Sequence, residues 1–309
     1  MIKYAILFPG QGAQFFGMGK SFYEQNRESK AIYDLASQIL GVDLKSLCFE
    51  ENDMLNQTIN TQKSIVVTSI AIYKAIEMLI PEKPYAFVGF SLGEYSALYA
   101  SKVFSLELIL DLINKRSIWM QEASILNPGS MVALQGGDIV LIQDFCDKVT
   151  KEIGNLQISN FNSPQQKVLS GTNLAIEYLL ENFQETKAKR AVKLNVSGAF
   201  HSPLMSEAAS KMEKLVSILK YYSPQIPIIM NTNASYLDIK RLPELMKKQI
   251  ETPVLFEDSI RLLIQEGVSL FIEVGPGQIL SSLVKKIDSD VKTISISEIS
   301  DLSKLEDIL

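Results

Sequence analysis

Short apolar runs alternate with helix-periodic segments over the first part of the chain. The run KYAILF (residues 3–8) ends at PGQG, which predicts a strand followed by a tight turn. Residues 64–80 repeat apolar side chains at helical spacing and stop before Pro81 and Pro84. The alternation continues with a predicted strand at 85–90 and predicted helices at 91–100 and 106–126. Strands that alternate with helices in this way predict parallel βαβ units.

The order of elements changes after about residue 128. The next six predicted elements are a strand, a helix, two strands, a helix and a strand, at residues 131–135, 139–153, 156–161, 166–171, 174–186 and 190–196. That order is typical of the ferredoxin-like split unit. We therefore expect an α/β protein in which a ferredoxin-like small domain, residues 128–197, is inserted into a discontinuous large domain, residues 1–127 and 198–309. The larger pattern resumes with a helix after HSP, a strand at 226–231, a helix ending near QIETP and a strand at 269–274.

Composition narrows the class of protein. The chain has 309 residues, of which 47% are hydrophobic and 21% charged, enough to bury a large core in one or two domains. The first apolar stretch is too short for a secretory signal and no 18 uncharged apolar residues run together, so we expect a cytoplasmic protein without a membrane segment. A net charge of -5 argues against nucleic acid as a partner. Cys48 and Cys146 lie far apart, which argues against a disulfide framework and a thiolate metal site.

The stretch GFSLGEYSAL (residues 89–98) places a serine where a predicted strand changes to a predicted helix. GxSxG in this position is typical of a nucleophile elbow, a sharp turn that exposes the hydroxyl of Ser91. The helix N-terminal amides, led by that of Leu92, would then face an oxyanion forming beside the serine. The alternative is an ordinary helix start with Ser91 as its cap. Glu94 is predicted to be a solvated carboxylate in the first turn of that helix.

The chain holds a single histidine, His201, so a proton transfer that needs an imidazole near neutral pH must use it. Metal sites built on two or three histidines are excluded. Ser202 followed by Pro203 is the N-cap and first-position pattern of a helix, which puts His201 just before the N-terminus of that helix. The helix dipole there is expected to keep the ring neutral, as a general base requires. A lone histidine is more often a packed or surface residue, but an elbow serine that needs a base favours the catalytic hypothesis.

Arg116 is predicted to lie on the apolar face of a helix. Residues at helical spacing along 106–126 form an apolar stripe that consists of Ile109, Leu112, Ile113, Trp119 and Met120, with Arg116 among them. Burying a guanidinium without an anion costs several kcal/mol. Two hypotheses follow: an internal pair with a structural carboxylate, or a bidentate hold on the carboxylate of a substrate.

Two further features are a glycine-rich turn near the N-terminus and a set of four carboxylates. The glycines of PGQGAQFFGMGKS match neither the dinucleotide-binding nor the P-loop spacing, which leaves a turn that brings backbone amides close to a ligand. A catalytic triad would need an acid that orients the imidazole. Four carboxylates are candidates by position only: Asp238, Glu244, Asp258 and Glu273.

Several stretches together resemble one family. FPGQGAQ, GFSLGEYSAL, RSIWMQEA, NFNSPQQ, GAFHSPLM, QIETPVLF and EVGPGQIL, in this order and at these separations, are similar to motifs of the malonyl-CoA:acyl carrier protein transacylases of fatty acid synthesis and of the related polyketide acyltransferases. The likeness covers almost the whole chain. It implies an α/β-hydrolase-like large domain with an inserted ferredoxin-like small domain.

The resemblance also implies roles for individual residues. Ser91 would be the nucleophile that accepts the acyl group, and His201 its base. Arg116 would clamp the free carboxylate of the malonyl group. The backbone amides of Gln11 and Leu92 would form the oxyanion hole.

Two more residues take roles by the same resemblance. Gln249 matches the position whose backbone carbonyl steadies the histidine, which would explain the missing acid. Phe200 would fill the space that an α-methyl group needs, so that malonyl is preferred to methylmalonyl. The family commonly has histidine immediately before the nucleophile, where this chain has Phe90, which puts the shape and polarity of the pocket beside the serine in doubt.

The implied reaction is a ping-pong transfer of malonyl from coenzyme A, through Ser91, to the phosphopantetheine thiol of an acyl carrier protein. No cofactor or metal is expected, and the protein is expected to be a monomer. An acidic carrier protein would need a basic surface, for which Lys187, Lys189 and Arg190 are candidates. The alternatives are an acyl-thioester hydrolase, a polyketide-pathway acyltransferase that acts in trans, and a catalytically silent carrier-docking module.

Overall fold

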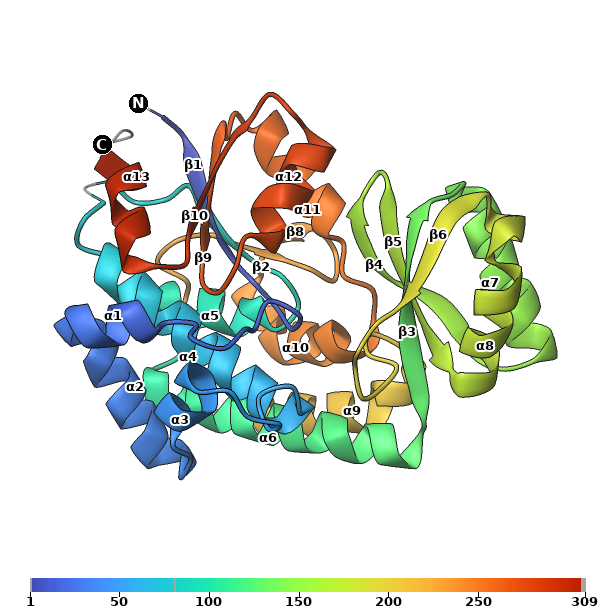
Figure 1. Cartoon of the computed structure of the whole chain (residues 1–309), viewed down its shortest axis with the longest axis horizontal. Coiled ribbons are helices and arrows are strands. Elements are labelled where there is room, and N and C mark those ends of the chain that lie inside the picture. Colours follow the sequence, from blue (N-terminus) through green and yellow to red (C-terminus); the bar gives the residue numbers. More distant parts are fainter. Residues whose placement is uncertain (1, 81, 307–309) are drawn as a thin grey trace.

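The larger of two sheets forms the centre of the molecule. A computed structural model describes residues 2–80 and 82–306. Within them lies a six-stranded sheet in the order β10-β9-β1-β2-β7-β8, in which all neighbours are parallel except β7 and β8 (Figure 1). Its strands are β1 (Tyr4–Phe8), β2 (Ala86–Gly89), β7 (Ile228–Met230), β8 (Ser235–Tyr236), β9 (Leu270–Val274) and β10 (Lys292–Ile296). The parallel βαβ organisation predicted from the sequence is confirmed.

The central strands are buried on both faces. Alternate residues of β1 join different cores: Ile6 and Phe8 belong to one apolar cluster, and Ala5 and Leu7 to the other. Both clusters are covered by helices, so every residue of β1 and β2 is buried. A parallel strand covered on both faces reads as a continuous apolar run, which is the pattern that predicted these strands.

Helices form a layer on each side of the large sheet. The apolar cluster that contains Ile6 also contains residues of α4, α5 and α6, and the cluster that contains Ala5 also contains residues of α11 and α12. The helices outside the small sheet are α1 (Lys20–Gln25), α2 (Arg27–Leu40), α3 (Leu44–Phe49), α4 (Thr58–Ile76), α5 (Gly93–Ala100), α6 (Leu106–Leu126), α9 (Ser206–Ser217), α10 (Leu242–Glu251), α11 (Phe256–Gln265), α12 (Ile279–Ile287) and α13 (Ser303–Glu306). None of the helices described is both long and apolar enough to cross a membrane.

The main differences from the predicted helices lie in the first 80 residues. Helix α4 begins at Thr58, six residues earlier than predicted, because its first turns bury polar side chains such as Gln62 that an apolar repeat does not reveal. It ends at Ile76, and Pro81 lies outside the described residues. Helices α1, α2 and α3 were not predicted; α1 and α3 have only six residues each, too few to display a helical repeat.

A second sheet, of four antiparallel strands, lies beside the first (Figure 1). Its order is β4-β5-β3-β6, and helices α7 and α8 pack on one face. The elements are β3 (Gly129–Gly136), α7 (Ile139–Glu152), β4 (Leu156–Ser163), β5 (Gln166–Thr172), α8 (Asn173–Asn182) and β6 (Ala188–Lys193). The predicted order of strand, helix, strand, strand, helix, strand is confirmed. Alternation along β3 sends Val132 and Leu134 toward the helices, whereas Met131 and Ala133 join the core of the larger part.

Backbone pairing joins the small sheet to the segment between α10 and α11. The N–H of Phe161 in β4 donates to the carbonyl of Val254 at 2.9 Å, and the N–H of Val254 donates to the carbonyl of Ser159 at 2.9 Å. A nearly buried ion pair joins Lys167 on β5 to Glu257 on α11, with a distance of 3.1 Å. These contacts hold the small sheet against the carboxyl ends of the large-sheet strands, where the candidate site lies.

Candidate active site

Ser91 lies on a tight turn between β2 and α5. Its own φ is +49°, in the left-handed region, whereas Gly89 and Gly93 do not have positive φ. The glycines are needed for space: a Cβ on Gly89 would lie 2.0 Å from the backbone N of Glu94, and a Cβ on Gly93 would lie 2.1 Å from the carbonyl oxygen of Phe8. The predicted strand-turn-helix context is present. The alternative in which Ser91 caps the helix is wrong, because the N-cap of α5 is Leu92 and no side chain caps it.

The only histidine of the chain meets the hydroxyl of Ser91. Ser91 Oγ and His201 Nε2 are 2.7 Å apart, and His201 is only 3% exposed. The backbone of His201 is fixed from two sides: its N–H donates to the carbonyl of Ile250 on α10 at 3.2 Å, and Gln157 Nε2 of β4 donates to its carbonyl at 2.6 Å. Its φ of +57° is also left-handed. Both members of the pair therefore sit on backbone that neighbouring elements hold in an uncommon conformation.

The imidazole of His201 is held in its neutral form. Burial, and then the charge of Arg116, lower the pKa of His201 to about 3, while the backbone carbonyls of Gln249 and Thr252 act in the opposite direction. Nδ1 has no hydrogen-bond partner of good geometry among the described residues, so those carbonyls lie near the ring without a well-aligned bond. The sequence predicted that the dipole at the N-terminus of a helix keeps the imidazole neutral. Ser202 does cap a turn there, with its Oγ accepting from the N–H of Leu204, but burial is the leading cause.

No carboxylate orients the imidazole from the positions considered in the sequence. Glu273 accepts hydrogen bonds from the N–H groups of Leu280 and Ser281, at 3.0 and 2.7 Å, and so caps α12. Glu244 pairs with Arg241 on the surface. The other two candidates lie elsewhere: Asp238 caps the 3-10 turn Ile239–Arg241, and Asp258 is exposed.

Glu94 differs from its prediction. It was expected to be solvated, yet it is 1% exposed. Helix α5 is buried on nearly all sides, so that its first turn has no face in water. Burial raises the pKa of Glu94 to about 8, and its carboxyl group accepts a hydrogen bond from the backbone N–H of Asn231.

Arg116 is buried, as the apolar stripe predicted. It is 2% exposed on α6, and its guanidinium donates to the side-chain oxygens of Gln62 at 2.7 Å and Gln249 at 3.3 Å. The guanidinium carbon also lies 5.4 Å from the ring centroid of Tyr95. No carboxylate of the described residues lies within 4.0 Å of it, and Nε is buried without a partner. The internal ion pair considered above is therefore not formed, and a buried cation has only neutral oxygens as hydrogen-bond partners.

A cavity of about 220 Å³ collects these groups between the two sheets. Six of the seven predicted site residues line it: Gln11, Ser91, Leu92, Arg116, Phe200 and His201. Gln249 lies just behind, where its Nε2 donates to the carbonyl of Ser91 at 2.6 Å. The small sheet contributes a polar wall of Asn160, Asn162 and Gln166, which was not predicted although NFNSPQQ stood out in the sequence. Gln62 and Asn231 were also missed, because neither carries a local motif.

Two residues that line the cavity, Gln11 and Leu92, have backbone amides without a hydrogen-bond partner among the described residues. Close packing brings their turns together, since a Cβ on Gly10 would lie 2.4 Å from the carbonyl oxygen of Phe90. Phe90 itself lines the cavity and packs edge-on against Phe256, with ring centroids 5.3 Å apart.

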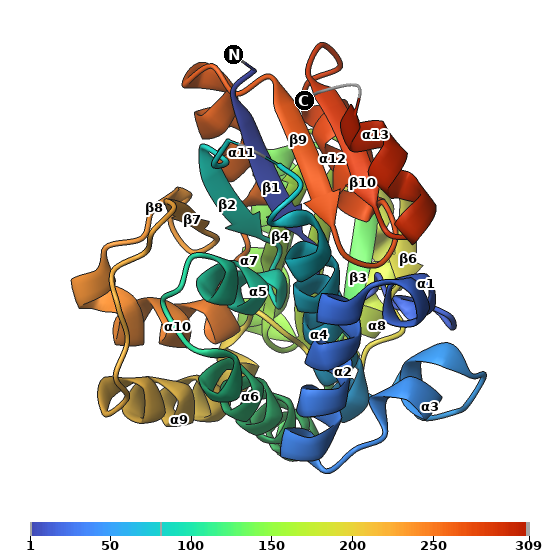
Figure 2. The same cartoon turned by 90° about the vertical axis from the view of Figure 1, so that its left-hand side faces the viewer.

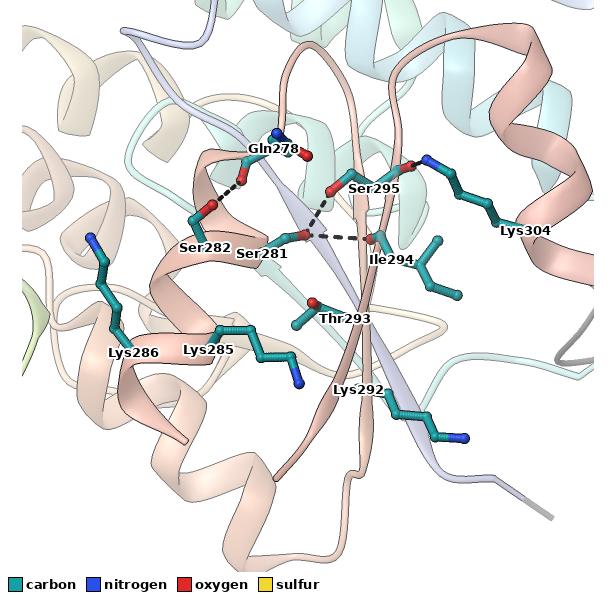
Figure 3. Close-up of a pocket in the computed structure, with 10 residues that line it drawn as sticks. All are labelled: Gln278, Ser281, Ser282, Lys285, Lys286, Lys292, Thr293, Ile294, Ser295 and Lys304. Carbon is teal, nitrogen blue, oxygen red and sulfur yellow. Dashed lines mark hydrogen bonds between the residues drawn. The ribbon is translucent and has the colours of Figure 1, made fainter. Parts of the chain in front are cut away.

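A larger hollow lies on the surface between α12 and β10 (Figure 3). It measures about 820 Å³, and its charged residues are Lys285, Lys286, Lys292 and Lys304. Lys285 donates to the carbonyl of Ser289, and Lys304 pairs with Asp301 at 2.7 Å. The hollow holds no pair of nucleophile and base, so the smaller cavity is the candidate active site.

The cavity combines a hydroxyl hydrogen-bonded to a neutral imidazole, two free amides and a buried cation. That set of groups can form and discharge a serine ester, and can bind an acyl group that carries a negative charge. The fold and the site therefore define an α/β protein of serine-based acyl-transfer chemistry.

Comparison with known proteins agrees with this class. The family described as "Acyl transferase domain" matches residues 6–301. A relative from Bacillus subtilis, named malonyl CoA-acyl carrier protein transacylase, is 41% identical over 300 residues, which are 96% of this chain and 94% of the relative. The solved MCAT of Streptococcus pneumoniae has a TM-score of 0.93 at 38% identity and covers 99% of this chain and 100% of its own.

A third comparison is a solved complex of a type II PKS acyl-carrier protein with its malonyl-transacylase. It has a TM-score of 0.95 at 29% identity and covers 99% of this chain and 100% of its own. The chain belongs to the acyl transferase domain family.

Proposed function

We propose that this protein is a malonyl-CoA:acyl carrier protein S-malonyltransferase. One observation carries the proposal: the hydrogen-bonded pair of Ser91 and His201 shares a cavity with the guanidinium of Arg116, which has no carboxylate partner among the described residues. Relatives named malonyl CoA-acyl carrier protein transacylase match nearly the whole chain. The cavity, of about 220 Å³, has room for an acyl group of a few carbon atoms.

In the first half-reaction, Ser91 Oγ attacks the thioester carbonyl of malonyl-CoA while His201 Nε2 takes the hydroxyl proton. The amides of Gln11 and Leu92 donate to the oxyanion that forms. The carbon–sulfur bond then breaks, and His201 returns its proton to the sulfur of coenzyme A. The product is a malonyl ester of Ser91 and free coenzyme A. A neutral imidazole at physiological pH, as burial here enforces, is the form that can accept the proton.

The second half-reaction repeats these steps with a different thiol. The phosphopantetheine thiol of the carrier protein gives its proton to His201 and attacks the ester carbonyl. The carbon–oxygen bond to Ser91 breaks, and the proton returns to Oγ, which restores the free enzyme. Loss of one oxyanion donor typically raises such a barrier by about 2.7 to 4 kcal/mol.

Arg116 supplies the selectivity in this proposal. The malonyl carboxylate would supply the counter-ion of the guanidinium, which hydrogen bonds to Gln62 and Gln249 already orient. Acetyl-CoA has no such group and would leave the buried cation unpaired, which penalises its transition state. Phe200, 5% exposed in the cavity wall, would occupy the space that the methyl group of methylmalonyl needs.

We further propose that the two sheets form two domains with the expected bounds. The large one, residues 1–127 and 198–309, would be α/β-hydrolase-like, which the mainly parallel sheet and the serine turn after β2 support. The small one, residues 128–197, would be ferredoxin-like, which the strand order β4-β5-β3-β6 and the helices on one face support.

The partner in this proposal is an acyl carrier protein, like the partner of the structural relative solved in complex with one. Lys187, Lys189 and Arg190 are exposed at the small sheet and remain the proposed docking residues. The absence of a cofactor or metal, the monomeric state and the cytoplasmic location remain predictions.

The test is intact-mass analysis after separate incubation with malonyl-CoA, acetyl-CoA and methylmalonyl-CoA. A malonyl adduct that Ser91→Ala abolishes is expected, and preferential acetylation would contradict the assigned selectivity. The hydrolase alternative is separated by measuring free malonate with and without carrier protein. Rapid release of malonate that ignores the carrier would contradict transfer.

A further inference from the structure

The turn that carries Ser91 is tied to a neighbouring strand by one buried asparagine. Asn231 Oδ1 accepts the backbone N–H of Ser91 at 2.6 Å, and Asn231 Nδ2 donates to the carbonyl of Gly89 at 2.7 Å. Asn231 follows β7 directly, and β7 pairs with β2, whose last residue is Gly89 (Figure 2). The side chain therefore spans the turn from the end of the adjacent strand.

Glu94 closes this arrangement from the other side. Its carboxyl group accepts the backbone N–H of Asn231, and both residues are 1% exposed. The carbonyl of Asn231 accepts the N–H of Leu255 at 2.9 Å, so all four polar groups of Asn231 are engaged. Asn231 is therefore hydrogen-bonded to Gly89, Ser91 and Glu94, which together form one buried network.

The position of this hydrogen-bond network at the Ser91 turn indicates its role. The φ of +49° at Ser91 is costly for a residue with a side chain and persists only where the surroundings impose it. Helix α5 supplies contacts after the turn and β2 before it, but only Asn231 bonds to both the N–H of Ser91 and the carbonyl of Gly89. A shift of the turn would move Oγ relative to His201 Nε2 and to the two free amides.

We infer that Asn231 and Glu94 are positioning residues for the nucleophile: Asn231 holds the backbone of Ser91 in its left-handed conformation, and Glu94 holds Asn231. The inference rests on the proposed acyl transfer for its kinetic readout. Glu94 acts as a hydrogen-bond acceptor, so that a neutral amide in its place can do the same. This role would not extend to the proton transfer itself, since neither side chain contacts Oγ.

The test compares Asn231→Ala, Asn231→Asp, Glu94→Ala and Glu94→Gln with a matched control. Ser101→Ala is that control, because the buried Ser101 hydroxyl ties the other end of α5 to Ile226, just before β7, and accepts its N–H at 3.0 Å. We expect kcat for malonyl transfer to fall on the order of 100-fold in Asn231→Ala with little change in KM. Glu94→Gln should retain most activity, Glu94→Ala should lose it, and Ser101→Ala should lose stability but keep kcat.

A spectroscopic readout makes the test independent of catalysis. The tag-free chain has one histidine, so ¹⁵N-labelled imidazole gives one set of signals, and Nε2 reports its hydrogen bond to Ser91. In Asn231→Ala, or in Asn231→Asp if that variant does not fold, the signals should shift toward those of Ser91→Ala, whereas Ser101→Ala should leave them in place.

Unchanged imidazole signals and an unchanged kcat in both Asn231 variants would overturn the inference. Equal losses in Glu94→Gln and Glu94→Ala would overturn the role of Glu94 as an acceptor. If the unmodified protein forms no malonyl adduct, the proposed function fails, while the imidazole signals still decide the positioning role.

Discussion

The guanidinium of Arg116 and the side chain of Gln249 form a hydrogen bond of 3.3 Å in the wall of the cavity. The other end of the same amide donates to the carbonyl of Ser91 at 2.6 Å. Gln249 thus links the group that would bind the substrate carboxylate to the backbone of the nucleophile. Its side chain makes better-defined contacts than its backbone carbonyl, which only lies near the imidazole.

Gln249→Glu should weaken binding of malonyl-CoA. A carboxylate at this position would give Arg116 an internal counter-ion and so compete with the carboxylate of the substrate. The KM for malonyl-CoA is expected to rise on the order of tenfold, which corresponds to about 1.4 kcal/mol. Steady-state kinetics would measure this, with Gln249→Met as the uncharged control. If the KM for malonyl-CoA rises as much in Gln249→Met as in Gln249→Glu, the lost amide rather than the new charge is responsible.

Arg116→Ala should narrow the preference for malonyl-CoA over acetyl-CoA. Removing one partner of a buried, hydrogen-bonded charge pair costs about 2 to 5 kcal/mol, or roughly 30- to 4,000-fold in kcat/KM for malonyl-CoA. The thermal midpoint should change less than the kcat/KM for malonyl-CoA, because the free protein loses a costly buried cation along with its hydrogen bonds to Gln62 and Gln249. Competition between the two thioesters, followed by mass spectrometry, measures the ratio. An unaltered ratio would contradict a role for Arg116 in selectivity.

The stability contributed by His201 should depend on pH in a defined direction. Its pKa is about 3 in the folded protein and about 6.5 when unfolded, so between these values the unfolded chain binds more protons. The contribution is therefore fully present above pH 6.5 and is lost as pH falls toward 3, with a slope of up to about 1.4 kcal/mol per unit. Glu94, whose pKa is raised to about 8, acts in the opposite sense from pH 4.5 to 8.

Comparing the wild type with His201→Gln isolates the contribution of His201 to the free energy of unfolding, because the wild type and the variant both contain Glu94. Urea unfolding from pH 4 to pH 7.5 should show a difference in free energy of unfolding that grows in favour of the wild type as pH rises, and levels off above 6.5. A constant difference across this range would mean that the imidazole is not buried in its neutral form.

Gly93→Ala should destabilise the protein far more than an alanine at an open glycine. The new Cβ would lie 2.1 Å from the carbonyl oxygen of Phe8, in the backbone of a buried strand that cannot yield. Gly267→Ala is the control: its φ is +88°, and no described atom outside the neighbouring residues would lie within 4 Å of the new Cβ, so that it measures only the conformational penalty of about 1 to 2 kcal/mol. Thermal unfolding would compare the two, and equal losses would contradict the steric account.

Charge reversal at Lys187, Lys189 and Arg190 should raise the KM for the carrier protein without altering acylation by malonyl-CoA. Rim charges act on encounter with a partner rather than on chemistry, and the effect should diminish at high salt. The comparison is the same reversal at Lys285, Lys292 and Lys304 in the hollow of Figure 3. A rise in KM only in the second set would move the docking surface to the hollow formed by α12, β10 and α13.

Local pattern predicted the elements that bear the chemistry. The helix Leu106–Leu126 has the predicted bounds, because its apolar stripe, with Arg116 among it, extends over its whole length. The serine turn was predictable since a strand, GxSxG and a helix follow one another without a break. The histidine was singled out by being the only one in the chain. The short helices α1 and α3 and the polar first turns of α4 escaped prediction because they show no apolar repeat, whereas α2 was missed although its buried residues follow helical spacing.

The sequence by itself determined the groups to which the proposed acyl transfer is assigned: one serine on a turn, one imidazole, and one cation on an apolar face. Only the tertiary structure decided how they are held. Glu94 is buried and bonded to Asn231, 137 residues away, and Gln249 bridges Arg116 and Ser91 from α10. Such contacts join residues that carry no local signal, because the partner of a buried polar group is chosen by packing across elements rather than by its neighbours along the chain.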